Sequence, residues 1–200
     1  RYVDFVAGVG TAACRQRIEG FEREVLLRRD AMMARMSDQA AARGLGYDLI
    51  GVVPSFEGKV AGFAFAFWQY RDESACDSIP GAAASDDEVW RFFDEVARTL
   101  FATDSYVLGL EPYHWQAYTQ LGTPGIDTTA IDDLLTVDLG AVDDLPSIEL
   151  APVFDPAPME DVADWVADEG SHILFVYGEN DPWTAAAFEV GGGEDAYCFV

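Results

Sequence analysis

Basic residues are scarce in this chain of 200 residues. Lysine and arginine together number 12 against 36 aspartates and glutamates, and the formal net charge at pH 7 is -24. Lys59 is the only lysine. Because so acidic a chain repels a polyanion and has no basic stripe to release counterions, the composition argues against nucleic-acid binding. It favours a solvated surface suited to salty or extracellular conditions, and cationic ligands such as the free amino terminus of a peptide.

Long hydrophobic runs are also missing. The longest, residues 60–68, is too short to span a bilayer and contains Gly62 and several alanines. We therefore predict no membrane segment. The chain opens at Arg1–Phe5 without an initiator methionine, a basic region or a cleavage site, so we expect any signal peptide to have been removed or to lie outside this sequence.

Cysteine and histidine are too few and too scattered to form a metal site. Cys14, Cys76 and Cys198 include no Cys-x-x-Cys pair, and neither of the two histidines lies at ligand spacing from them. The aspartate-rich stretch 124–158, interpreted as a surface excursion, lacks the pattern of a calcium loop. We expect no metal and no cofactor. If the protein is exported, one disulfide and one buried thiol is the simplest arrangement, and otherwise three buried thiols.

The residues that are present predict a core and several helices. Half of the chain is hydrophobic and 13% is aromatic, which suffices for one or two domains. Apolar side chains at three- and four-residue steps predict one long helix or two in series over residues 11–43, with Gly44 as the stop. Ser85 and Glu88 form a capping box that predicts a helix to about Thr99.

Less regular patterns follow in three other segments. Residues 47–53 form a short β-like run, and Ser55 is placed to cap a helix that includes residues 60–70. The aromatic and amide-rich segment 106–121 is predicted to be helical after Pro112. The first three quarters of the chain are therefore predicted to be mostly helical.

The carboxyl-terminal part changes to an alternation of helix and strand. Residues 159–166 predict an amphipathic helix, and Ile173–Tyr177 is an apolar run that suits a strand buried on both faces of a parallel sheet. Residues 196–200 predict another strand. The predicted fold class is α/β, with a mostly helical unit over residues 1–155 and the last part of an α/β sheet over residues 156–200.

Asp181 follows the first of these strands, where the carboxyl end of a parallel strand presents side chains to a crevice. It is either a catalytic acid or the cap of a helix that begins near Thr184. A Ser-His-Asp triad would need a Gly-x-Ser-x-Gly turn and a histidine after the acid, and the chain has neither. His114 and His172 precede Asp181, and His172 lies at the other end of the strand. Cys14 as a nucleophile would need His114 as its partner.

Seven collinear blocks, spread over nearly the whole chain, together resemble one family. The blocks are Val9–Arg15, Phe65–Tyr70, Cys76 with Ile79–Pro80, Ser85–Asp87, Gly109–Tyr113, Tyr118–Gly122 and Leu174–Trp183. They are similar to the secreted serine peptidases of the S37 type, the tripeptidyl aminopeptidases first associated with Streptomyces. The resemblance implies an α/β-hydrolase in which a helical cap domain is inserted between sheet strands, and which cleaves short peptides from the amino terminus of extended substrates.

The resemblance also implies roles for particular residues. Asp181 matches the triad acid, whereas the serine would precede Arg1 and the histidine would follow Val200. The chain is thus expected to be an internal piece of a longer, secreted and monomeric enzyme, and to be inactive alone. Cys14 and Cys76 lie in matching blocks and are candidates for a disulfide. The candidates for contacts with the peptide are Trp68, Gln69, Glu111, Tyr118 and Gln120. Packing in the protein core explains the presence of these residues equally well.

Two other hypotheses remain open on the sequence. One is a non-catalytic, acidic, helical interaction module whose α/β tail serves only for docking. The other is a prolyl carboxypeptidase of the S28 kind, because that related family also places an Asp-Pro-Trp after a late strand. The coding sequence on either side of the segment separates the hydrolase from the interaction module. An assay in which one end of the peptide is blocked separates the two peptidases.

Overall fold

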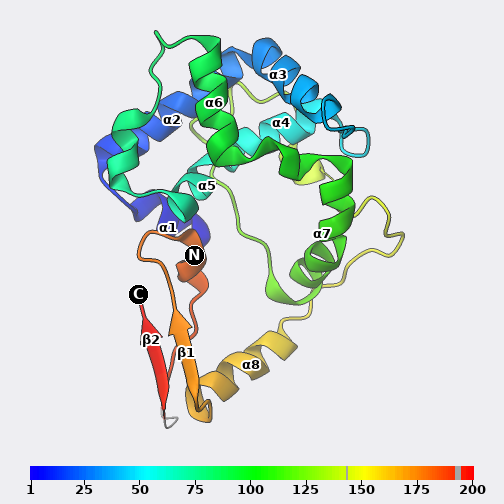
Figure 1. Ribbon diagram of the computed structural model, residues 1–200. Coiled ribbons are helices and arrows are strands. Elements are labelled where there is room, and N and C mark those ends of the chain that lie inside the picture. Colours follow the sequence, from blue (N-terminus) through cyan, green and yellow to red (C-terminus); the bar gives the residue numbers. More distant parts are fainter. Residues whose placement is uncertain (143, 192–194) are drawn as a thin grey trace.

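Helices make up most of the structure, a computed structural model that describes residues 1–142, 144–191 and 195–200 (Figure 1). The helices are α1 (Tyr2–Gly8), α2 (Ala12–Leu27), α3 (Arg29–Ala41), α4 (Val52–Ala61), α5 (Phe63–Tyr70), α6 (Asp86–Ala97), α7 (Asp104–Gln116) and α8 (Ala157–Asp168). The strands are β1 (Ile173–Val176) and β2 (Ala196–Phe199). Shorter helical turns are η1 (Glu73–Ser78), η2 (Thr99–Ala102), η3 (Ala117–Leu121), η4 (Leu139–Ala141) and η5 (Pro182–Ala186). No helix within these ranges is long and apolar enough to cross a membrane.

Two of the predicted helical segments are confirmed. The segment predicted as one helix or two in series divides at Arg28 into α2 and α3. The Thr11 hydroxyl caps α2, because it accepts a hydrogen bond from the backbone N–H of Cys14 at 3.3 Å. At the start of α6 the predicted capping box is present: Ser85 accepts from the N–H of Glu88, and the Glu88 carboxylate accepts from the N–H of Ser85.

The β-like run predicted over residues 47–53 is wrong. The chain turns there, and α4 begins at Val52. Gly51, with φ of 96°, leads the backbone into the helix. Pro54 then lies in the first turn, where the missing N–H removes no hydrogen bond of the helix. The prediction that Ser55 caps the helix is wrong as well, because Ser55 lies inside α4 and is buried.

The helix predicted over residues 60–70 is divided at Gly62 into α4 and α5. Beyond this break, α5 packs against α2 and α6. The ring centroid of Phe63 lies 5.1 Å from that of Phe21 and 6.1 Å from that of Phe93. These contacts form an aromatic core shared by three helices of the helical body, which comprises α2 to α6.

The helix predicted after Pro112 begins earlier. α7 starts at Asp104 and carries Pro112 in its interior. A proline inside a helix removes one hydrogen bond and costs about 3 kcal/mol. The helix persists because Val107 and Glu111 anchor it from the buried side.

The stretch predicted as a surface excursion, residues 124–158, is in part attached to the core. Glu57 on α4 is fully buried, and its carboxylate accepts hydrogen bonds from the Thr136 N–H at 2.8 Å and from the Thr136 hydroxyl at 2.6 Å. The same carboxylate pairs with Arg29 at 2.6 Å. Ile131 is only 1% exposed. The stretch is therefore irregular in backbone but fixed to the helical body.

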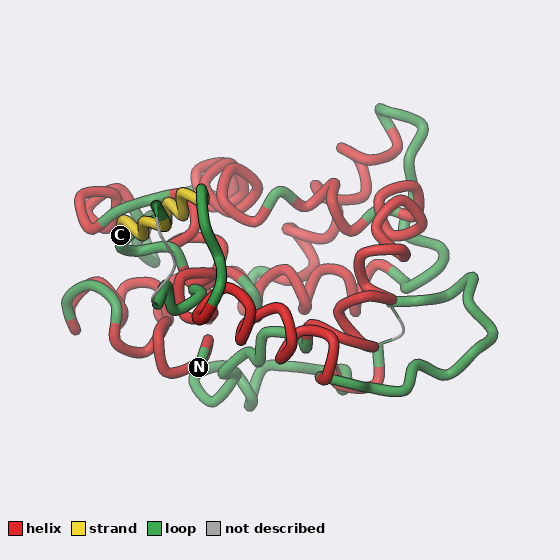
Figure 2. The backbone as a smooth tube through the Cα atoms, turned by 90° about the horizontal axis from the view of Figure 1, so that it is seen from below, coloured by secondary structure: helices red, strands yellow, loops and turns green. Residues whose placement is uncertain are grey.

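The two strands form a small parallel sheet at one edge of the molecule (Figure 2). Ile173 pairs with Ala196, as expected for two late strands of an α/β sheet. The prediction that the first strand is buried on both faces is wrong for the described part of the chain: Leu174 and Val176 are 63% and 72% exposed. The reason is that β1 has β2 as its single neighbouring strand within the described ranges.

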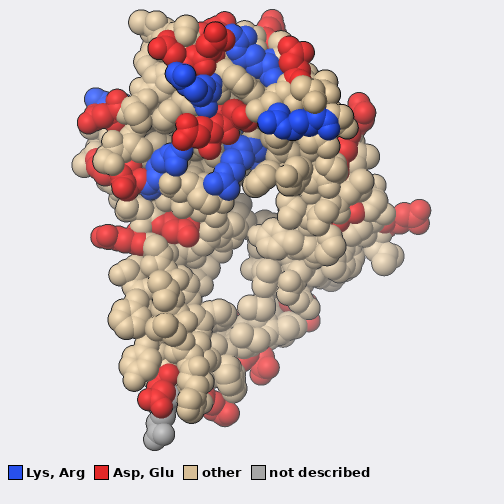
Figure 3. All heavy atoms as spheres, in the orientation of Figure 1, with Lys and Arg blue, Asp and Glu red and all other residues tan. Residues whose placement is uncertain are grey.

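Charge is distributed unevenly over the two parts of the molecule. All basic residues precede Thr99 in the sequence. In Figure 3 the lysine and arginine side chains accordingly gather over the helical body. The charged side chains visible on α8 and the strands are all acidic. The same view shows an opening between the helical body and the unit of α8 and the strands.

Candidate functional site

The turn after β1 places Asp181 beyond the carboxyl end of the strand. One carboxylate oxygen, Oδ1, accepts a hydrogen bond from the backbone N–H of Trp183 at 3.0 Å. The Asp181 N–H donates to the carbonyl of Gly178 at 3.1 Å, and the Thr184 hydroxyl donates to the same carbonyl at 2.7 Å. Within the described ranges the second oxygen, Oδ2, accepts no hydrogen bond from the chain. The turn is therefore fixed by its backbone, and one oxygen of the acid is left available.

The hypothesis that Asp181 caps a following helix is correct in a limited sense. Its bond to Trp183 caps η5, a short 3-10 turn at residues 182–186, rather than a longer helix beginning near Thr184. Capping uses Oδ1 alone. The capping role therefore does not exclude a second partner at Oδ2.

Trp183 anchors the turn of Asp181 to the helical body. Its ring centroid lies 5.6 Å from that of Tyr2 on α1 and 5.1 Å from that of Phe65 on α5, edge-on in both cases. Such pairs contribute about 0.5–1.5 kcal/mol beyond their buried area. The acid is thus held at the junction between the strands and the helical body.

The two predicted contact residues on α5 lie in different surroundings. Trp68 is 2% exposed and packs against Gly10, whose φ is 65°. A Cβ atom at Gly10 would come within 2.2 Å of Trp68 Cη2, so this close approach requires glycine. Trp68 also lines a cavity that is described below. Gln69 is half-buried near the end of α5 and does not line that cavity.

The other three predicted contact residues lie on α7 and η3, across the molecule from β1 (Figure 1). The buried carboxylate of Glu111 accepts hydrogen bonds from the N–H of Ser147, at 2.7 Å, and from the Ser147 hydroxyl. Tyr118 donates to Asp144 at 2.7 Å and lines a different cavity from Trp68. Gln120 is half-buried. The structure therefore does not gather the five residues into one pocket, and the Glu111 carboxylate already has partners.

Neither histidine is placed to serve Asp181. His172 lies at the opposite end of β1, and its Nε2 is 4.0 Å from Asp195 Oδ2. His114 lies on α7, and its buried Nδ1 has no hydrogen-bond partner among the described residues. The described ranges also contain no group of three or more His, Cys, Asp or Glu side chains that could hold a metal ion.

Cys14 and Cys76 are joined by a disulfide in the structure. Their Cα atoms are 5.5 Å apart, and the bond ties α2 to η1 across 62 positions of sequence. A bonded Cys14 has no thiolate, so it cannot act as a nucleophile. Cys198 on β2 is free and exposed, which makes the predicted third, buried thiol wrong.

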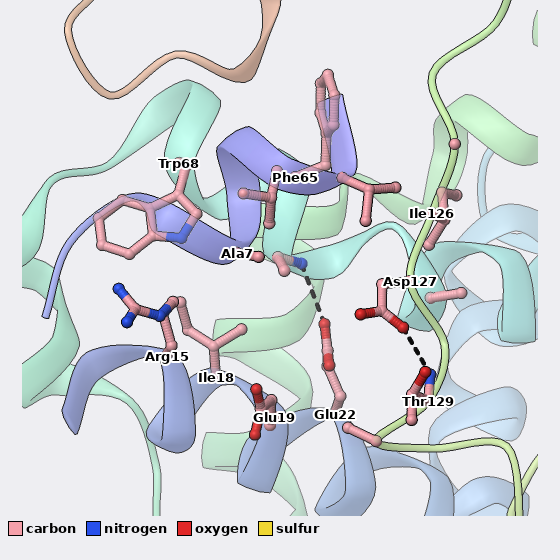
Figure 4. A pocket seen from close by; sticks show the side chains of 16 residues that line it. Ala7, Arg15, Ile18, Glu19, Glu22, Phe65, Trp68, Ile126, Asp127 and Thr129 are labelled. Atoms are coloured by element: carbon pink, nitrogen blue, oxygen red, sulfur yellow. Dashed lines mark hydrogen bonds between the residues drawn. The ribbon is translucent and has the colours of Figure 1, made fainter. Parts of the chain in front are cut away.

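A cavity that the sequence did not reveal lies between α1, α2, the junction of α4 and α5, and residues 125–130 (Figure 4). Its volume is about 350 Å³. Aromatic rings of Phe65 and Trp68 line one side, and the carboxylates of Glu22 and Asp127 line the other. Glu22 stands four residues after Ile18 on the apolar face of α2, and an acid in that position was the signal available in the sequence.

The electrostatics of this cavity are dominated by its acids. Burial, together with the smaller effect of the neighbouring charges of Glu19 and Asp127, raises the pKa of Glu22 to about 8, against the lowering effect of one hydrogen bond from the Ala64 N–H at 3.1 Å. The pKa of Asp127 is instead lowered, because the hydroxyl and the backbone N–H of Thr129 donate to its carboxylate.

Arg15 is the basic residue among the lining side chains, but its charge is directed elsewhere. Its Nη1 donates to the carbonyl oxygens of Gly10 at 2.6 Å and Val9 at 3.0 Å. These carbonyls follow the carboxyl end of α1. The acids of the cavity therefore have no ion-pair partner among the described residues.

Comparison with known proteins shows to which family the chain belongs. A family model described as PS-10 peptidase S37 matches residues 1–200. The class is thus that of the serine peptidases. The chain belongs to the peptidase S37 family.

One relative makes the comparison more specific. Over 197 residues the chain is 34% identical to the prolyl tri/tetrapeptidyl aminopeptidase of Streptomyces mobaraensis. The match covers 98% of this chain and 41% of that protein, so the chain spans about two fifths of the length of the relative. No solved structure matches. The hypothesis of a non-catalytic interaction module gains no support from these matches.

Proposed function

We propose that the full-length enzyme is a serine exopeptidase that releases tripeptides and tetrapeptides from the amino terminus of extended peptides. Membership of the peptidase S37 family supports peptide-bond hydrolysis, and the name of the Streptomyces relative supports cleavage near the amino terminus of the peptide. The observation that carries the catalytic role is the carboxylate of Asp181, fixed at Oδ1 by the Trp183 N–H and available at Oδ2.

Asp181 acts in this proposal as the orienting acid of a Ser-His-Asp triad. Its Oδ2 accepts a hydrogen bond from Nδ1–H of the catalytic histidine, which fixes the tautomer that can take the proton of the serine. The carboxylate also stabilises the imidazolium formed during acyl transfer. Rigidity at Oδ1 matters, because a small misplacement of the acid turns the histidine away from the nucleophile.

We place this unit in an α/β-hydrolase fold, with residues 1–155 as a helical cap and residues 156–200 as the last part of the sheet. Parallel sheets occur with both faces covered, and an isolated pair of strands is marginal in water. The outward side chains of β1 and β2 are apolar and exposed, with Leu174, Val176 and Phe199 at 63%, 72% and 58%. The remaining strands and helices of the same enzyme are the expected cover for this surface.

The present chain alone is expected to be inactive. A triad acid supplies no nucleophile, proton shuttle or oxyanion hole, and the chain has no Gly-x-Ser-x-Gly turn and no histidine after Asp181. We further propose a secreted, monomeric enzyme. The disulfide between Cys14 and Cys76 supports an oxidising compartment.

The direct test of the function is an end-blocking assay with the full-length enzyme. Three versions of a peptide whose third residue is proline are compared: free at both ends, acetylated at the amino terminus, and amidated at the carboxyl terminus. We expect mass spectrometry to find a released tripeptide from the free and amidated versions and far less from the acetylated version. Cleavage of the free and acetylated versions but not of the amidated version would instead identify a carboxypeptidase of the S28 kind, and no cleavage of any version would refute the peptidase proposal.

A further inference from the structure

The cavity between α1, α2 and α5 has the composition of a binding site for an amphipathic cation. One wall, formed by α1 and α5, is apolar and aromatic, with Val3, Val6, Phe65 and Trp68. The other wall carries Glu19, Glu22 and Asp127. Ligand sites are commonly apolar cavities of this kind with a few convergent polar groups, and a volume of about 350 Å³ suits a small group.

Glu22 is the acid that points most directly to a ligand. It is only 6% exposed, and its Oε1 is fixed by the Ala64 N–H at 3.1 Å. Oε2 has no hydrogen-bond partner in the part of the chain that the structure describes, and the side chain extends from α2 into the cavity (Figure 4). Buried polar groups are normally paired, so an incompletely paired carboxyl group in a cavity calls for an outside donor.

The charge of that donor follows from the surroundings. Glu19 and Asp127 add negative potential at Glu22, and Arg15 is bound to backbone carbonyls. An anion entering this cavity would be repelled by the charges of Glu19 and Asp127, whereas a cation would be attracted by them. An ammonium group has three N–H donors and no acceptor, which matches the available carboxylate oxygens.

The cavity and the acid turn lie on two sides of one aromatic residue. Phe65 lines the cavity, and its ring centroid lies 5.1 Å from that of Trp183, two residues after Asp181. Helix α1 joins the two places in the same way, because Val3 and Val6 line the cavity while Tyr2 contacts Trp183. A peptide held in the cavity would therefore approach the region of the triad acid.

We propose that this cavity binds the amino-terminal residue of the substrate, with its ammonium group at Glu22 and its apolar part against Phe65 and Trp68. This inference rests on the proposed aminopeptidase function and names the site that selects for a free amino terminus. Glu22 gives up its proton when the ammonium enters, since a nearby cation favours the charged carboxylate. Asp127 contributes charge from the rim.

The test measures selectivity between a free and an acetylated amino terminus in the full-length enzyme. We compare kcat/KM of wild type, Glu22→Gln and Asp127→Asn for a free-amine chromogenic tripeptide and its acetylated analogue. Removing the charged partner of a hydrogen bond should lower kcat/KM for the free peptide about 10- to 100-fold in Glu22→Gln and less in Asp127→Asn. The acetylated analogue carries no ammonium group, so its slow reaction should fall less than that of the free peptide, and the ratio of kcat/KM between the two substrates should decrease.

Asp30→Asn is the matched control, because it removes one negative charge from an exposed acid on α3 that does not line the cavity. It should keep the wild-type ratio. Circular dichroism checks that each variant is folded. An unchanged ratio in folded Glu22→Gln, or an equal loss with both substrates, would overturn the inference. If wild type cleaves neither peptide, the proposed function fails instead, so the two failures are distinguishable.

Discussion

The buried carboxyl group of Glu22 gives the most quantitative prediction, which concerns stability rather than catalysis. The pKa of Glu22 rises from an ordinary value of 4.5 to about 8, first because of burial and then because of Glu19 and Asp127. Arg15 lines the same cavity, but its guanidinium is bound to carbonyl oxygens and forms no ion pair with Glu22 that would offset this rise. Since one pKa unit corresponds to about 1.4 kcal/mol, ionising Glu22 in the folded protein costs on the order of a few kcal/mol.

The sign of the pH dependence follows from linkage. Below about pH 4.5 Glu22 is protonated in both the folded and the unfolded state. Between about pH 4.5 and 8 the unfolded chain loses this proton while the folded protein keeps it, so the free energy of unfolding falls as the pH rises. Above about pH 8 both states are ionised, and the folded protein carries the full cost of a buried charge.

Glu22→Gln removes this dependence while keeping the shape of the side chain and an oxygen that accepts from the Ala64 N–H. We expect the variant to match wild type near pH 4 and to exceed it by a few kcal/mol above pH 8. Urea denaturation at pH 4, 6 and 8.5 measures the difference, with Asp30→Asn as the control for the change in net charge. A variant that is less stable than wild type at pH 8.5, or a difference that does not grow with pH, would refute the reasoning.

Other features of the structure give further expectations. Cys14→Ser should lower the free energy of unfolding by about 2–4 kcal/mol, and two free thiols at Cys14 and Cys76 in non-reducing mass spectrometry would contradict the disulfide. Gly10→Ala should destabilise the protein by more than about 1 kcal/mol, because the backbone is left-handed there and the new methyl group would collide with the Trp68 indole. Gly20→Ala, inside α2 with open space around it, should instead stabilise the protein by up to about 1 kcal/mol. Thermal melts that rank the two variants the other way would be contrary evidence. Glu57→Gln should lower the free energy of unfolding by about 3–5 kcal/mol, since it removes one partner of the ion pair with Arg29. A decrease below about 1 kcal/mol in urea denaturation would show that the pair contributes little.

Structural features that depend on only a few neighbouring residues could be predicted from the sequence. Ser85 and Glu88 sit three positions apart, and their reciprocal bonds depend on nothing else in the chain. The strand before Asp181 and the turn after it were predictable for the same reason, because an apolar run, glycine and proline act locally.

Predictions failed where distant contacts decide the outcome. Residues 47–53 have a β-like composition, yet the chain turns there, because the Asp104 carboxylate accepts hydrogen bonds from the backbone N–H groups of Asp48 and Leu49 at 3.0 and 2.9 Å. Pro112 was expected to begin a helix, but the buried Glu111, bonded to Ser147, keeps α7 continuous through it.

The acid-lined cavity was beyond local reasoning altogether. It is assembled from α1, α2, the junction of α4 and α5, and residues 125–130, and no window of sequence contains them together. Glu111, the acid that the sequence predicts to contact the peptide, is bonded to Ser147, whereas Glu22 lies among the apolar residues of α2 and has one oxygen available. Which acid is paired and which is left available is a property of the tertiary structure.

The role of Asp181 as the triad acid can be tested by measuring the turnover of the full-length enzyme carrying Asp181→Asn. With a chromogenic Ala-Ala-Pro substrate, we expect kcat to fall by about 10⁴-fold, because the histidine loses its tautomer and orientation. Glu179→Gln, which changes an exposed acid in the same turn, should stay close to wild type. A kcat of Asp181→Asn within about tenfold of wild type would contradict the account and leave Asp181 as the cap of η5 alone.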